Sequence, residues 1–337
     1  MAYNARLDRI VEYHADTCKL APGRVAVKRA SLLQVALVLV AAPLLIALRF
    51  GDSTSDVVEW PIPEFAEPSG VVYHPLRDSL FLVGDEGDIG EVSLEGKLLR
   101  QFRLGGDLEA IAVDPKSGLL FVVREGHEVI FEVRPDNFKI VRRFTVDRSY
   151  NGDPNFLRRG GDGIEGLTFV PDDHHPEGGK LWAVNQFDPP VLIELGIALK
   201  TSKEKYQVAR IARAIPVDGA PLSEVTWDPG SRKFLVLSAL WKRAVVLDVD
   251  GKLERSVRVP AFMAEGLTRL PDGRVVIAQD SGGLVAWNPR GDPFAGEAAA
   301  GPPDPGPGNG SAAPVSTVPA AGATKRDPAK TEPRRGP

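Results

Sequence analysis

Cysteine is almost absent from this sequence, because Cys18 is the only one in 337 residues. An intrachain disulfide is therefore excluded, and any large domain must be held together by its hydrophobic core. Histidine is also scarce, and no His or Cys set has the spacing of a zinc site. His174 and His175 are adjacent in the polar run DDHHPEGG, which we interpret as a solvated loop, with a metal-binding pair as the alternative.

Motifs of the common catalytic classes are missing as well. The sequence contains no nucleophile elbow, no P-loop and no dinucleotide fingerprint, and the GGDG at Gly160–Gly163 is typical of a turn. The sequence therefore leaves the catalytic residues unknown. A basic excess is missing too, since 41 Lys and Arg face 45 Asp and Glu, so we expect no nucleic-acid partner.

One uncharged apolar run, ASLLQVALVLVAAPLLIAL at Ala30–Leu48, is long enough to cross a membrane. As a helix it spans roughly 28 Å, close to the ~30 Å hydrocarbon core of a bilayer. Basic residues precede the run and acidic residues soon follow it, so the positive-inside rule places residues 1–29 in the cytoplasm. We predict an uncleaved signal anchor over 30–49 in the inner (cytoplasmic) membrane, with a cleaved signal peptide as the alternative. The rest of the chain would then be extracytoplasmic or periplasmic.

Internal repeats dominate the remainder of the sequence. One phrase recurs five times, as SGVVYHP from Ser69, EAIAVDP from Glu109, EGLTFVP from Glu165, SEVTWDP from Ser223 and EGLTRLP from Glu265. Each phrase precedes a turn and a second apolar run, and third and fourth runs usually follow. The starts are 40, 56, 58 and 42 residues apart, which fits four-stranded propeller blades of about 40 residues with insertions. The 34 Gly and 29 Pro supply the many turns that such blades need.

The sequence therefore predicts an all-β fold, a β-propeller of four-stranded blades over residues 56–290, preceded by one transmembrane helix and a linker at 50–55. We count five blades, and a sixth formed from the insertions at 172–213 is the alternative. A sandwich or a solenoid accounts less well for the repeated phrase. The segment Val57–Pro63 is predicted to be the outer strand that the last blade lacks. The Pro, Ala and Gly-rich tail at 291–337 is predicted to be disordered.

A propeller brings the start of each first strand and the end of each second strand to the same mouth of its channel. The predicted metal ligands at that mouth are Glu109, Glu165, Glu265, Asp85 and Asn185. Secondary candidates are Ser69, Glu125, Ser223 and Asp280. Crowded carboxylates repel one another, and a set of oxygen ligands suits Ca²⁺. The alternative is a structural ring without a metal, in which these side chains form hydrogen bonds with backbone amides or with Arg124 and close the channel.

The five phrases, together with LFLVGDEG after the first, resemble the SdiA-regulated propeller family over roughly Glu67 to Asn288. The resemblance implies a β-propeller with calcium in its channel, an N-terminal membrane anchor and no established biochemical activity. This sequence departs from the family at Glu224, where a Gly is expected, and at Gln279, where a Ser is expected.

Three functions follow as hypotheses. The first is a membrane-anchored propeller that binds calcium and, at the channel mouth, an unknown ligand or envelope partner. The second is a calcium-dependent hydrolase of lactones, esters or phosphoesters, in which the metal polarises the substrate oxygen. This hypothesis depends on fold analogy alone. The third is an envelope scaffold.

Overall fold

The computed structural model describes residues 56–158, 163–217 and 221–295. Within these residues no helix is long and apolar enough to cross a membrane. The predicted anchor at 30–49 and most of the predicted tail lie outside the described residues.

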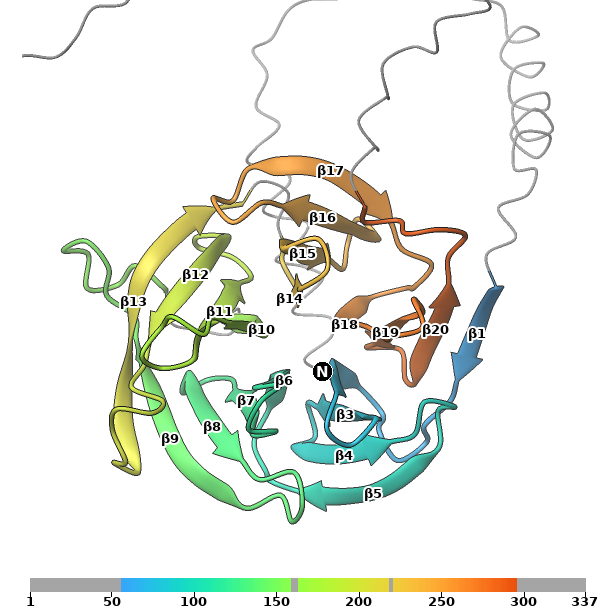
Figure 1. Cartoon of the computed structure of the whole chain (residues 1–337), viewed down its shortest axis with the longest axis horizontal. Coiled ribbons are helices and arrows are strands. Elements are labelled where there is room, and N and C mark those ends of the chain that lie inside the picture. Colours follow the sequence, from blue (N-terminus) through green and yellow to red (C-terminus); the bar gives the residue numbers. More distant parts are fainter. Residues whose placement is uncertain (1–55, 159–162, 218–220, 296–337) are drawn as a thin grey trace, which may run out of the picture. The chain divides into compact units, whose positions relative to one another are not determined.

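Twenty strands form five four-stranded blades around a central axis (Figure 1). The inner strands are β2 (Pro68–His74), β6 (Leu108–Val113), β10 (Ile164–Pro171), β14 (Glu224–Asp228) and β18 (Ala264–Arg269). The second strands are β3 (Ser79–Gly84), β7 (Leu120–Arg124), β11 (Gly179–Asn185), β15 (Lys233–Ser238) and β19 (Val275–Gln279). The third strands are β4 (Asp88–Val92), β8 (Val129–Val133), β12 (Val191–Gly196), β16 (Arg243–Leu247) and β20 (Leu284–Asn288). The outer strands are β5 (Leu98–Arg103), β9 (Ile140–Asp147), β13 (Tyr206–Pro216), β17 (Leu253–Arg258) and β1 (Asp56–Trp60).

The ring is closed by strands from both ends of the domain. β1 pairs antiparallel with β20, so that Val57 faces Trp287 and Trp60 faces Leu284. The predicted closing strand is therefore confirmed for its first residues. The residues assigned to a hypothetical sixth blade instead form β11, β12 and β13 of the third blade, and the described part of the chain has five blades.

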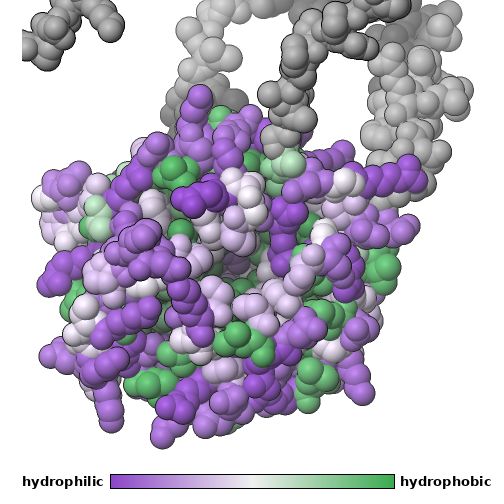
Figure 2. Space-filling view, in the orientation of Figure 1, coloured by the Kyte–Doolittle hydropathy of each residue, from purple (hydrophilic) through white to green (hydrophobic). Residues whose placement is uncertain are grey.

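The hydrophobic core consists of layers between neighbouring blades, because each sheet buries both of its faces. Five clusters of buried residues fill these layers, one for each pair of adjacent blades. The layer between the fourth and fifth blades includes Phe294, which is 1% exposed and lies beyond the predicted domain end at 290. One face of the ring is mostly hydrophilic, with separate hydrophobic residues and a hollow at the centre (Figure 2).

The second and third blades are joined at their outer edges. β13 runs parallel to β9, with Tyr206 facing Arg143 and Arg210 facing Asp147, so the two blades form one eight-stranded sheet. The pairing covers an outer edge that would otherwise leave backbone amides and carbonyls unpaired.

Inner strands approach one another closely around the channel. A Cβ atom on Gly166 would lie 2.5 Å from the Val225 backbone nitrogen, and one on Gly266 would lie 2.7 Å from that of Val71. Such distances exclude any side chain, which explains the Gly in the second position of these two repeat phrases. Glu224 occupies the corresponding position of the fourth blade, and β14 lies less closely against β18 than other inner strands lie against their neighbours.

Candidate functional site

The candidate residues gather at one mouth of the channel because of the strand register. In the third blade Ile164 faces Asn185, and in the second Leu108 faces Arg124, so each strand start lies beside a second-strand end. Four inner strands have a β-bulge at this point, and the bulged residues are the candidates Ser69, Glu109, Glu165 and Glu265. A bulge re-aims a side chain that the regular strand would direct elsewhere.

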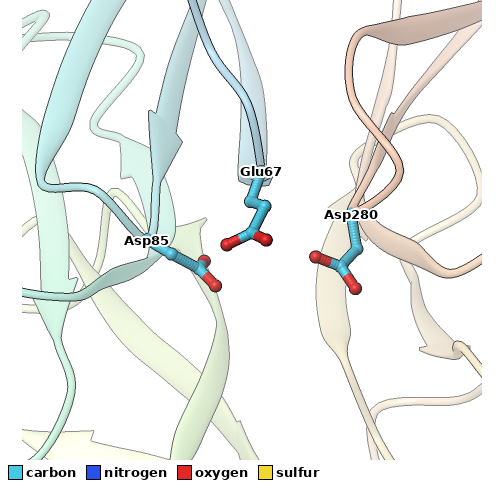
Figure 3. Close-up of side chains that lie close together, drawn as sticks. All are labelled: Glu67, Asp85 and Asp280. Atoms are coloured by element: carbon cyan, nitrogen blue, oxygen red, sulfur yellow. The ribbon is translucent and has the colours of Figure 1, made fainter. Parts of the chain in front are cut away.

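Seven carboxylates form what we call the acidic arc: Glu67, Asp85, Asp107, Glu109, Glu125, Glu165 and Asp280. They make up three groups, and within each group the potential ligand oxygens all lie within 4.8 Å of one another. The first group joins Glu67, Asp85 and Asp280, which extend toward one another from the first and fifth blades (Figure 3).

The second group is Asp85, Asp107 and Glu109, and the third is Glu109, Glu125 and Glu165. Asp85 and Glu109 each belong to two groups, so the arc is continuous from the fifth blade to the third. The structure thus brings together five of the predicted residues of the mouth, Asp85, Glu109, Glu125, Glu165 and Asp280, and it adds two that were not predicted.

Those two additions, Glu67 and Asp107, lie two residues before the repeat phrases of their blades. The amide of Asp85 donates to the Glu67 carbonyl at 3.2 Å, and the amide of Glu125 donates to the Asp107 carbonyl at 2.9 Å. These backbone bonds hold both residues at the mouth. Extending the comparison of repeats two residues upstream would have revealed them.

Asn185 adds a neutral oxygen beside the arc. Its side-chain amide nitrogen donates to the carbonyls of Phe187 and, at 2.9 Å, of Pro189. Its Oδ1 atom is buried and has no hydrogen-bond partner among the described residues, and the same holds for Oε1 of Gln186. Asn185 faces Ile164 across the sheet, so this residue lies one position along the strand from the level of Glu165.

The remaining candidates have other surroundings. Ser69 donates a hydrogen bond to Asp85, and Ser223 donates to the Ala264 carbonyl at 2.8 Å, which links the fourth and fifth blades. Glu265 lies outside the three acidic groups and next to Glu224. Burial raises the pKa of Glu224 well above its usual range, a backbone hydrogen bond from Val225 partly offsets this, and the charge of Glu265 raises it further.

Two arginines near the arc have different roles. Arg148 forms an ion pair with buried Glu128, whose carboxylate accepts the amide of Ile164 and so fixes the residue before Glu165. Burial raises the pKa of Glu128, and Arg148 partly offsets the effect. Arg124 was the expected partner of a purely structural ring, but it forms no ion pair among the described residues. Its guanidinium instead lies over the Phe131 ring, with 5.2 Å between the Cζ atom and the ring centroid.

The adjacent histidines belong to a turn. The His174 amide donates to the Asp172 carboxylate at 2.9 Å, and the Glu177 amide donates to Nδ1 of His175 at 3.2 Å. Neither histidine belongs to a potential metal-binding group within the described ranges. The interpretation as a loop therefore accounts for the contacts that the pair makes.

The described chain is thus a β-propeller of five blades whose channel opens into an acidic mouth. Its sequence matches the SdiA-regulated family over residues 52–272, about two thirds of the chain, and the chain belongs to that family. No functionally curated protein is significantly similar to it in sequence.

Two solved structures with a similar fold have low sequence identity to this chain. Glutaminyl cyclase of Myxococcus xanthus has a TM-score of 0.49 at 17% identity, over 69% of this chain and 94% of that one. Virginiamycin B lyase of Staphylococcus aureus has a TM-score of 0.38 at 12% identity, over 68% of this chain and 73% of that one. Similarity at this level carries no information about what the present chain binds.

Proposed function

We propose that this chain is a membrane-anchored, extracytoplasmic propeller that binds calcium at the acidic arc and thereby holds a ligand or an envelope partner. The observation that supports the proposal is the convergence of carboxylates from four blades, with Asp85 and Glu109 shared between groups. Carboxylates this close repel one another, and a cation bound between them would offset that repulsion.

The donor set favours calcium over other metals. Ca²⁺ takes six to eight oxygen ligands at about 2.3–2.6 Å, so ligands on opposite sides of the ion are about 4.8 Å apart. The ligand oxygens of each group lie close enough together for one such ion to contact all three residues of the group. Asn185 and Gln186 supply neutral oxygens of the kind that complete such a shell. Mg²⁺ requires a stricter octahedron, and zinc prefers nitrogen and sulfur.

Glu109 is the residue on which to test the proposal, because it belongs to two groups and is only 4% exposed. A calcium chelator should lower the melting temperature of the wild-type chain, and added calcium should restore it. An ion that binds only the folded state contributes ~2.7 kcal/mol at a hundredfold excess over its Kd. Glu109→Gln should lose most of this response. In chelator, it should be at least as stable as the wild type, because one crowded charge is gone.

The matched control is Glu95→Gln, which changes an exposed residue in the turn between β4 and β5. This variant should respond to calcium and chelator as the wild type does. A wild-type melting temperature that ignores both additions would refute calcium binding. A ring with a purely structural role predicts that result together with a loss of stability in Glu109→Gln.

A further inference from the structure

A cavity of about 600 Å³ lies in the channel at the mouth opposite the acidic arc. It is lined by the second halves of four inner strands, by the whole of β14, and by the turns that follow these strands. One proline from each repeat phrase contributes to its lining: Pro75, Pro115, Pro171, Pro229 and Pro271. The proline of each repeat phrase therefore lines this cavity and not the acidic mouth.

The wall of this cavity is mainly apolar, and its polar groups are largely occupied. The Thr268 hydroxyl accepts a hydrogen bond from the Tyr73 amide at 3.0 Å, and the Thr168 hydroxyl accepts one from the Trp227 amide at 2.9 Å. These hydroxyl groups join adjacent inner strands.

The charges of the lining are also paired. The guanidinium of Arg269 contacts the Asp228 carboxylate at 3.0 Å and the Asp292 carboxylate at 3.0 Å. With its charges neutralised in this way, the wall offers no attraction to a strongly charged ligand.

Glu224 is the exception in this wall. It lines the cavity, is 1% exposed, and has replaced the glycine found in three other blades. Its carboxyl group accepts the Val225 amide at Oε1, at 2.6 Å, and also interacts with the Leu167 amide of β10, whereas the Oε2 atom has no hydrogen bond of normal geometry among the described residues. A buried polar atom without a partner is costly, so a group that pairs with it from the cavity would be favoured.

We propose that this cavity binds a small, uncharged and mostly apolar molecule with one hydroxyl group that pairs with Glu224. The volume lies within the range of small-molecule sites, which combine apolar walls with a few orienting polar groups. A hydroxyl group is the partner that fits, because it donates to a carboxylate and also accepts from a protonated carboxyl group. This site is separate from the calcium site, and neither proposal depends on the other.

The uncharged dye N-phenyl-1-naphthylamine tests the cavity in the purified full-length chain. Val113→Trp should abolish the saturable part of its binding. Val113 occupies the position that carries Tyr73, Phe169 and Trp227 in other blades, so the repeat already accommodates a large side chain there. Val58→Trp is the matched control, since Val58 is 53% exposed on the outer strand β1, and it should bind the dye as the wild type does.

The role of Glu224 is tested by competition for the same dye. In the wild type, 2-naphthol should displace the dye at about fivefold lower concentration than 2-methylnaphthalene, which has a similar shape and no hydroxyl group. Glu224→Met should abolish this difference.

Three results would overturn the proposal: no saturable binding in the wild type, unchanged binding in Val113→Trp, or an equal preference for the two naphthalenes in the wild type. If Val113→Trp does not fold, Val113→Phe repeats the test with the residue that the third blade carries.

Discussion

At the scale of single residues, Glu224 is the residue that departs most from the repeat. Its side chain occupies a position where Gly166 and Gly266 leave no room for any atom, so β14 and β18 must be further apart. A buried carboxyl group avoids most of the cost of desolvation by staying protonated. The raised pKa of Glu224 therefore links the stability of the propeller to pH.

We predict that the wild type becomes less stable as pH rises, because Glu224 is buried, and that Glu224→Gln does not. In the unfolded chain Glu224 ionises near its ordinary pKa, whereas in the folded chain it stays protonated to higher pH. Between these two pKa values ionisation stabilises only the unfolded state, so the free energy of unfolding falls. The wild type should lose up to ~1.4 kcal/mol per pH unit from this group once the pH exceeds about 4.5. Gln keeps an oxygen for the Val225 amide and has no such ionisation.

Urea unfolding between pH 5 and pH 8, in chelator, measures this difference. The two proteins should have similar stability near pH 4.5 and diverge at higher pH, with the variant more stable. Parallel curves would show that Glu224 has the same pKa in the folded and unfolded chains.

At the scale of strands, the close approach of inner strands determines which residues the channel tolerates. Gly266→Ala places a Cβ atom 2.7 Å from the Val71 amide nitrogen and 3.0 Å from the Gly70 Cα atom, both on the rigid backbone of β2. We expect a loss of about 1–3 kcal/mol in the free energy of unfolding, because the strands must separate.

Gly230→Ala provides the comparison, since a Cβ atom there meets nothing closer than 3.7 Å. It should leave the free energy of unfolding nearly unchanged in the same denaturant titration. Equal effects of the two substitutions would show that the gap between β18 and β2 can widen at little cost.

The closing strand β1 provides another prediction at this scale. Deleting residues 56–60 removes the backbone pairing with β20 and leaves an open edge on the last blade. The melting temperature should fall by several degrees, and aggregation should increase in light-scattering measurements.

The exposed side chains of β1 should contribute much less to the stability of the propeller than its backbone pairing does. Val57 and Val58 are 42% and 53% exposed, so a double replacement by threonine should melt close to the wild type. A deletion variant as stable as this control would mean that the ring does not need β1.

The sequence predicts the blades because their causes are local. Alternating apolar residues, turn residues and the recurring phrase specify four strands in each unit, and even the closing strand follows from the count. The parallel pairing of β13 with β9 has no such local cause, since it depends on how two outer strands meet after their blades have formed. Phe294 was assigned to the tail for a similar reason, because one aromatic residue in a proline-rich segment does not reveal the layer that buries it.

The sequence predicts residues of the acidic mouth where they occupy equivalent positions of the repeat. Equivalent positions pointed to Glu109 and Glu165, which do converge. The bulges that orient these side chains, and the unequal distances between inner strands, arise from packing of blades against each other.

At the scale of the whole molecule, the orientation across the membrane is the prediction with the widest consequence. A reporter enzyme that is active only outside the cytoplasm should work when fused after Ala295, where the described propeller ends. Fusion at this point keeps Phe294 in its layer. The same reporter fused before residue 30 should be inactive, and activity of a cytoplasm-only reporter after Ala295 would reverse the orientation.

The pairing of β1 with β20 also bears on how the protein is synthesised. A ribosome releases β1 first and β20 last, so the earliest strand of the ring must wait for almost the whole domain before it finds its partner. Four blades can form in order as they emerge, whereas the fifth stays incomplete until translation reaches Asn288. During that interval the edges are exposed to proteases and chaperones, and a chain cut short before residue 284 leaves its first strand permanently unpaired.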